Sequence, residues 1–220
     1  TVLDGAMGGE IQRRIPGAGH GLWSATALVK VPELVSDLHR EYIDAGADVI
    51  TTNTYSTVPS YLGKGGLADR FEEFTALAAR LARKAASQAD RLIRVAGALP
   101  PLDESYRSDL VPVFDEAAPI AAFLFNCTHP EAIEGGLQEL KALTDRPLGC
   151  YPNRLNRVPE GWTLDNERVV GVRNDLPVEL YVESIQRSIG HGATIVGGCC
   201  GIGPNYIRAM SESVRSATSA

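Results

Sequence analysis

Residues 193–201 carry the sequence Ala-Thr-Ile-Val-Gly-Gly-Cys-Cys-Gly, and this stretch decides the predicted fold. An apolar run rich in β-branched residues passes through two glycines into two adjacent thiols. The run has no alternating polar face, which is typical of a strand buried on both sides of its sheet. It therefore predicts a strand over residues 193–198 with reactive side chains at its carboxyl end.

The same kind of strand recurs along the chain and alternates with amphipathic helices. Helices are predicted over residues 32–45, 67–89, 130–143, 178–189 and 205–214. Further strands are predicted over residues 2–6, 48–54, 92–98, 121–126 and 147–151. Strands that alternate with helices pair in parallel beneath covering helices, so the pattern predicts an α/β fold.

Polar residues at the strand ends help to distinguish an open α/β sheet from a barrel. Asp4, Asn53, Cys127 and the pair Cys199-Cys200 each stand at the carboxyl end of a predicted strand. A doubly wound open sheet would hold the first and last of these ends far apart, whereas a (β/α)8 TIM-type barrel gathers them on one face. We therefore expect one barrel domain over residues 1–220, although only six strands can be identified.

Composition and charge limit the class of protein. The 220 residues have a formal net charge of −6, without the basic face of a nucleic-acid binder. No apolar run approaches the roughly 18 residues of a membrane span. The chain starts at Thr1, next to a predicted strand, so we expect no signal peptide. Its four cysteines do not resemble a disulfide framework, which favours a reduced, cytoplasmic protein that acts on small molecules.

The adjacent thiols of Cys199 and Cys200 indicate a metal site, because glycines on both sides allow consecutive side chains to face one ion. Cys127 closes another buried strand and is either the third ligand or a small core residue. Cys150 lies within a strand and is assigned to the core. Three thiolates leave Zn2+ with a net charge of −1, which is poor for activating water but suits the capture of a fourth thiol as thiolate. The implied chemistry is methyl transfer to a thiol.

Four motifs resemble the homocysteine S-methyltransferase family. They are Leu3-Asp4-Gly5-Ala6-Met7-Gly8, Thr52-Asn53-Thr54-Tyr55, Asn126-Cys127-Thr128 and Gly197-Gly198-Cys199-Cys200-Gly201, in the family's order.

This resemblance implies a (β/α)8 barrel enzyme of methionine biosynthesis, with zinc on Cys127, Cys199 and Cys200 and homocysteine as methyl acceptor. It implies that Asp4 holds the amino group of the substrate, that Gly5 lets the substrate approach the backbone, and that Asn53 is a polar support. No catalytic residue beyond the metal site is implied. From the residues alone, Asp4 could equally be a turn residue before Gly5, and Asn53 could equally be a cap at the end of a strand.

The chain departs from the family near Ile120/Ala121, where two strand–helix units are expected and absent. In the family, one of these absent strands carries a glutamate that also binds the amino-acid substrate. At roughly 30 residues a unit, about 60–80 residues are missing. Either the protein lacks this segment, or the sequence omits a stretch that the protein contains.

The methyl donor and the activity itself remain open. Free-standing members of the family commonly use sulfonium donors, so S-methylmethionine and S-adenosylmethionine are the candidates, with selenium analogues as other acceptors. Betaine would call for an aromatic cage, to which Trp23 and Trp162 could contribute if they are not packing residues. The alternatives are a non-catalytic zinc or thiol protein on a decayed barrel, and a redox role for Cys199-Cys200.

Overall fold

The computed structural model describes residues 1–15, 22–99, 120–157, 159 and 170–218. Its strands are short and all pair in parallel. They are β1 (Val49–Thr51), β2 (Arg94–Ala96), β3 (Phe123–Asn126), β4 (Leu148–Tyr151) and β5 (Ala193–Val196). β1 pairs with β2, and β4 lies between β3 and β5. Five of the six predicted strands are thus confirmed, each shorter than expected.

The first predicted strand joins the two sheets. Val2 bridges Val196 at the end of β5, and Leu3 bridges Val49 at the start of β1, both in parallel. The neighbours therefore run β2, β1, residues 2–3, β5, β4, β3. The chain's first and last strand segments lie side by side, as in a closed barrel and unlike an open doubly wound sheet. Within the described residues, β2 and β3 each pair on one side only.

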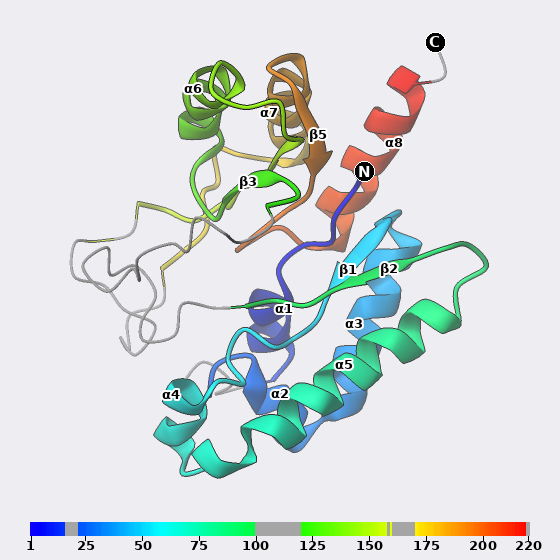
Figure 1. The fold of residues 1–220 in the computed structure, drawn as a ribbon, viewed down its shortest axis with the longest axis vertical. Helices are drawn as coiled ribbons and strands as arrows, with labels where there is room; N and C mark the ends of the chain where they lie inside the picture. Colours follow the sequence, from blue (N-terminus) through cyan, green and yellow to red (C-terminus); the bar gives the residue numbers. More distant parts are fainter. Residues whose placement is uncertain (16–21, 100–119, 158, 160–169, 219–220) are drawn as a thin grey trace.

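Helices cover both groups of strands, and Figure 1 shows them on either side of the N-terminal segment. On the side of β1 and β2 lie α1 (Met7–Arg14), α2 (Ala25–Lys30), α3 (Pro32–Asp44), α4 (Pro59–Leu62) and α5 (Phe71–Ser87), of which α3 and α5 pack against the strands. Those beside β3 to β5 are α6 (Pro130–Lys141), α7 (Val178–Gly190) and α8 (Pro204–Thr218). Two 3-10 turns, η1 (Gly63–Gly65) and η2 (Ala68–Arg70), connect α4 to α5.

The long helices were predicted within a few residues. Pro32 opens α3, and Gly46 follows its end with a φ of 103°, a conformation that glycine adopts without strain. The sequence did not predict α1, α2 or α4. Residues 2–6 are also less regular than expected, because only Val2 and Leu3 make strand bridges before α1 begins at Met7.

Two apolar clusters form the core. One lies between the strands and helices α3, α6, α7 and α8, and includes Tyr42, Ile50, Ile133 and Tyr181. The other lies among α1 to α5 and includes Ile11, Leu38 and Phe74. Cys150 belongs to the first cluster and is fully buried, as predicted. No helix in the described part of the chain has the length and apolar character needed to cross a membrane.

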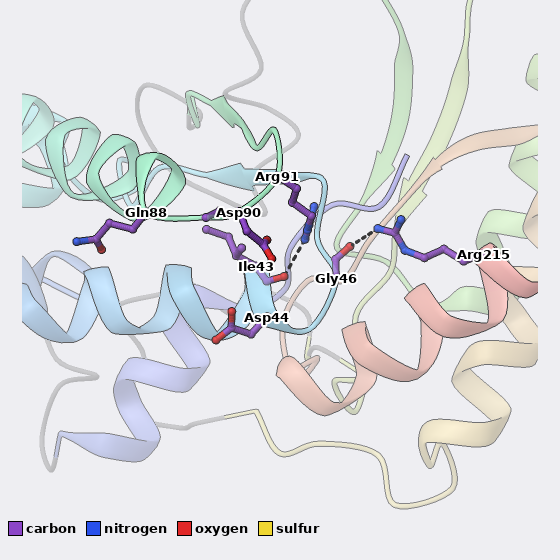
Figure 2. A pocket seen from close by; sticks show the side chains of 8 residues that line it. Ile43, Asp44, Gly46, Gln88, Asp90, Arg91 and Arg215 are labelled. Carbon is purple, nitrogen blue, oxygen red and sulfur yellow. Dashed lines mark hydrogen bonds between the residues drawn. The ribbon is translucent and has the colours of Figure 1, made fainter.

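A cavity of about 490 Å³ opens near the amino-terminal ends of β1 and β2 (Figure 2). One Nη of Arg91 donates to the carbonyl oxygens of Ile43 and Ala47, both at 2.8 Å. Arg215 donates to the carbonyl oxygen of Gly46 at 3.1 Å. These guanidinium groups satisfy carbonyls at the end of α3, so the arginines are already engaged in supporting the fold.

Candidate metal centre

Three thiols converge at the carboxyl ends of β3 and β5. Cys127 directly follows β3, and Cys199 and Cys200 follow β5 after two glycines. The Sγ of Cys127 lies 3.5 Å from that of Cys200, and the Sγ atoms of Cys199 and Cys200 are 3.9 Å apart. All three sulfurs lie within 4.8 Å of one another and are partly buried.

This arrangement fits a thiophilic metal ion. Four ligands at about 2.3 Å in a tetrahedron place neighbouring sulfur atoms about 3.8 Å apart. Two of the sulfur separations, 3.5 Å and 3.9 Å, are close to that value. The donor set consists of three soft sulfur atoms, which suits zinc better than a hard cation such as magnesium.

The backbone brings the thiols together through unusual conformations. Cys127 has a φ of 49°, in the left-handed region that non-glycine residues rarely occupy. Gly201, after the pair, has a φ of 80°. Gly197 and Gly198 instead have no room for a side chain, since a Cβ would lie 2.5 Å from Leu3 and 2.2 Å from Ile202. These two glycines thus allow close packing, and Gly201 supplies the turn.

The surroundings of Cys199 and Cys200 favour the protonated form of both thiols. The pKa of Cys200 is raised to about 12, first by its hydrogen bond with the Cys127 thiol and then by burial. Hydrogen bonds with Cys127 and Cys200, followed by burial, raise the pKa of Cys199 well above its usual range. Three clustered thiolates without a counter-charge would repel one another, so a bound divalent cation would have to displace the protons.

Asp4 lies beside the loop that carries the thiol pair. The backbone N–H of Gly198 donates to the carbonyl oxygen of Asp4 at 3.0 Å. The Asp4 carboxyl is 5% exposed and accepts the backbone N–H of Thr51 at 2.7 Å and its hydroxyl at 2.9 Å. Burial raises the pKa of Asp4 to about 7, although the bonds from Thr51 oppose the shift. This buried carboxyl can become a charged partner for a cation near neutral pH.

Gly5 and Asn53 have structural partners. A Cβ on Gly5 would lie 2.4 Å from the Ile202 carbonyl oxygen and 2.9 Å from the Tyr42 ring, so packing alone requires glycine there. Asn53 is 3% exposed and donates to the carbonyl oxygen of Ser24 at 3.0 Å, immediately before α2. Their predicted contacts with substrate stay predictions.

Sequence reasoning missed the residues that hold these loops. The Tyr181 hydroxyl on α7 donates to the carbonyl oxygen of Gly197 at 2.8 Å. Asn153, two residues after β4, donates to the carbonyl oxygen of Cys127 at 2.7 Å. Asn153 lies just past the strand predicted over residues 147–151, and this position could have marked it as a residue near the site. Trp23 stacks edge-on against Tyr55 with ring centroids 5.5 Å apart, whereas Trp162 lies outside the described residues.

The chain is similar to methyltransferases of known name. A family model described as homocysteine S-methyltransferase matches residues 1–116 and 107–214. Homocysteine S-methyltransferase 4 of Zea mays is 22% identical over 311 positions, covering 99% of this chain and 90% of the relative. Selenocysteine Se-methyltransferase of Brassica oleracea var. italica is 22% identical over 314 positions, covering 98% and 89%.

The fold also matches a solved structure. The metallated form of the homocysteine methyltransferase MmuM from Escherichia coli superposes with a TM-score of 0.71 at 21% identity, covering 96% of this chain and 95% of that one. The family model and the named relatives make this chain a methyltransferase, and its three clustered thiols are a candidate metal centre. The chain belongs to the homocysteine S-methyltransferase family.

The comparisons also bear on the internal gap. The two matched stretches of the family model meet at residues 107–116, just before the predicted seam at Ile120/Ala121. The 311 positions aligned with the Zea mays relative exceed the 220 residues of this chain by 91. Residues 100–119 lie outside the described part of the structure.

Proposed function

We propose that this enzyme transfers a methyl group from a sulfonium donor to the thiolate of homocysteine at a zinc ion held by Cys127, Cys199 and Cys200. The observation that carries the proposal is the convergence of these sulfurs within 4.8 Å of one another at the strand ends. Zinc, when bound, takes the place of the proton on the substrate thiol and keeps the sulfur as a thiolate at neutral pH.

The methyl transfer balances without a further reactant. The thiol proton goes to solvent, and the thiolate sulfur forms a bond to the methyl carbon. The bond between that carbon and the donor's sulfonium sulfur breaks, and its electron pair stays on the donor sulfur. S-methylmethionine and homocysteine would thus give two molecules of methionine, whereas S-adenosylmethionine would give methionine and S-adenosylhomocysteine.

Asp4 is the proposed anchor for the amino group of homocysteine. Its carboxyl is buried and ends a strand segment whose backbone bonds to the loop of the thiol pair at Gly198. An ammonium group close to this carboxyl would favour the charged form and lower its pKa. Gly5 would let the substrate approach the backbone, and Asn53 would be a polar support near the site. The whole of residues 1–220 would form one domain.

The proposed architecture is a (β/α)8 barrel that lacks two strand–helix units between β2 and β3. The neighbour order supports it, because residues 2–3 lie between β5 and β1 as the first strand of a barrel lies between the last and the second. The unpaired outer edges of β2 and β3 among the described residues also favour a second candidate function. A barrel open there could retain the metal without catalysis.

A methyltransfer assay separates the two candidates. The zinc-loaded protein is incubated with homocysteine and either S-methylmethionine, S-adenosylmethionine or betaine, and methionine is measured. Methionine from a sulfonium donor, lost in the Cys200→Ser variant and retained in Cys150→Ser, is expected. Zinc binding without methionine from any donor would favour the non-catalytic protein. Selenocysteine replaces homocysteine in a parallel reaction, because one relative is named for that substrate.

A further inference from the structure

Tyr151 lies between the two loops that carry the thiols. It is the last residue of β4, which has β3 on one side and β5 on the other. Its carbonyl oxygen accepts the backbone N–H of Cys127 at 3.1 Å. The carbonyl oxygen of the next residue, Pro152, accepts the backbone N–H of Cys199 at 2.8 Å. The backbone at Tyr151 and Pro152 is therefore bonded to both loops.

The side chain of Tyr151 points away from the covering helices. Successive side chains of a strand alternate between the two faces of its sheet. The preceding residue, Cys150, lies in the core beside α7, where it hydrogen-bonds with Ser188. The register partner of Cys150 on β3 is Phe125, which packs on α6 at Gly136. Both therefore face the helices, and Tyr151 faces the opposite side of the sheet, the interior of the proposed barrel.

The ring of Tyr151 is half-buried, and its hydroxyl has no hydrogen-bond partner in the described part of the chain. Burial, followed by the nearby Cys199 and Cys127 thiols, raises the pKa of Tyr151 to about 12. The hydroxyl therefore lies near both thiols and is neutral. The Tyr181 and Tyr206 hydroxyls instead bond to backbone carbonyl oxygens at 2.8 Å and 3.1 Å, which fixes their rings in the fold. Tyr151 is available for contact with a ligand beside the thiols.

We propose that the Tyr151 ring recognises the sulfonium group of the methyl donor. The sulfonium methyl must reach a homocysteine sulfur beside the three thiols, which brings the positive charge next to this ring. The face of an aromatic ring attracts a cation, most strongly where water is excluded. After transfer the donor is a neutral thioether and loses this attraction, which favours its release. The inference rests on the proposed function, in that the donor is taken to be a sulfonium.

The test compares a charged ligand with a neutral ligand of nearly the same shape. One pair is S-methylmethionine and its carbon analogue, in which a CH group replaces the sulfonium sulfur. The other pair is S-adenosylmethionine and neutral S-adenosylhomocysteine, and the donor that yields methionine decides which pair is used. Calorimetry measures binding to the zinc-loaded protein without homocysteine, so no turnover occurs. The ratio of the two dissociation constants reports recognition of the charge.

The wild type is expected to prefer the sulfonium. Tyr151→Leu should reduce this preference about 10–30-fold, because the ring is lost, and should leave the affinity for the neutral ligand nearly unchanged. Tyr151→Phe keeps the ring and should keep most of the preference. Zinc content and thermal unfolding of both variants show whether the site and the fold persist. An unchanged preference in Tyr151→Leu, an equal loss of both ligands, or loss of the preference in Tyr151→Phe would overturn the inference.

A second measurement leaves the shape of the side chain intact. Phenylalanines with increasing numbers of ring fluorines are incorporated at position 151, which weakens the negative face of the ring in steps. The preference for the sulfonium should fall with each step, and a constant preference would overturn the inference. Wild-type protein that yields no methionine from a sulfonium donor would overturn the proposed function and this inference with it. Normal methionine formation with an unchanged preference in Tyr151→Leu would overturn this inference alone.

Discussion

Replacing Asp4 with asparagine should abolish a specific pH dependence of stability. Burial raises the pKa of this carboxyl from 3.8 to about 7 in the folded protein. Between these pH values the folded state binds a proton that the unfolded state has released. The free energy of unfolding therefore falls as the pH rises from about 4 to about 7, so the stability that Asp4 contributes is full below the unfolded pKa and lost above the folded one.

The size of this effect follows from the shift. About three pKa units at about 1.36 kcal/mol each give a loss of about 4 kcal/mol across the window. The side chain of the Asp4→Asn variant does not titrate at this position, so the difference between wild type and variant isolates the carboxyl from every other group. Urea unfolding of the metal-free proteins between pH 4 and pH 8 measures it. Parallel stability curves for the two proteins would refute the assignment of a buried, proton-binding Asp4.

Thr51 provides a second test of the same carboxyl. Its hydroxyl donates to Asp4 at 2.9 Å and opposes the rise in pKa. Thr51→Val should therefore move the pH-dependent loss of stability to still higher pH. If Asp4 also holds the amino group of homocysteine, binding of this substrate should tighten as the pH passes about 7 in the wild type. The Asp4→Asn variant should lack that tightening.

Three further substitutions test separate parts of the molecule. His39 on α3 is fully buried, neither ring nitrogen has a hydrogen-bond partner within the described structure, and burial lowers its pKa to about 4. As the pH drops from 6.5 towards 4, His39 gains a proton in the unfolded state before it does in the folded state, so the free energy of unfolding should fall. His39→Leu should remove up to about 3 kcal/mol of this loss in urea titrations. The same fall in stability at low pH in wild type and variant would contradict the assignment. Cys150→Ala should leave the zinc content unchanged in elemental analysis, because Cys150 is fully buried in the apolar core and is not one of the three clustered thiols; loss of zinc would disprove that role. Arg91→Ala should lower the free energy of unfolding by about 2 kcal/mol through the two carbonyl bonds at the end of α3, and an unmoved urea midpoint would show that these bonds contribute nothing.

The sequence was most informative where one residue type has few structural uses. Adjacent cysteines between glycines pointed to a clustered thiol site, and the structure brings both within reach of Cys127. Parallel pairing also followed from the apolar strands, because sheets covered on both faces leave no polar alternation. The amphipathic repeat that marks α3 and α5 is long enough to identify a helix without knowledge of its partners.

Short helices and contacts between distant parts of the chain could not be predicted from the sequence. Helix α1 has two glycines among its first residues, and α4 has only four residues, so neither shows a sustained helical repeat. The role of Asn153 depends on Cys127, 26 residues earlier in the chain. Such a contact exists only once β3 and β4 pair, because their register sets the two loops side by side. Tertiary pairing, and not local sequence, creates this part of the site.

The zinc content of the protein tests the central claim most directly. Protein purified under reducing conditions is analysed for metal beside a Cys199→Ser, Cys200→Ser double variant. The account predicts about one zinc ion per wild-type chain and none in the variant, because the three thiols lie close enough to bind one ion and would leave one tetrahedral position open. Wild-type protein that binds no zinc, even after reconstitution with the metal, would contradict it.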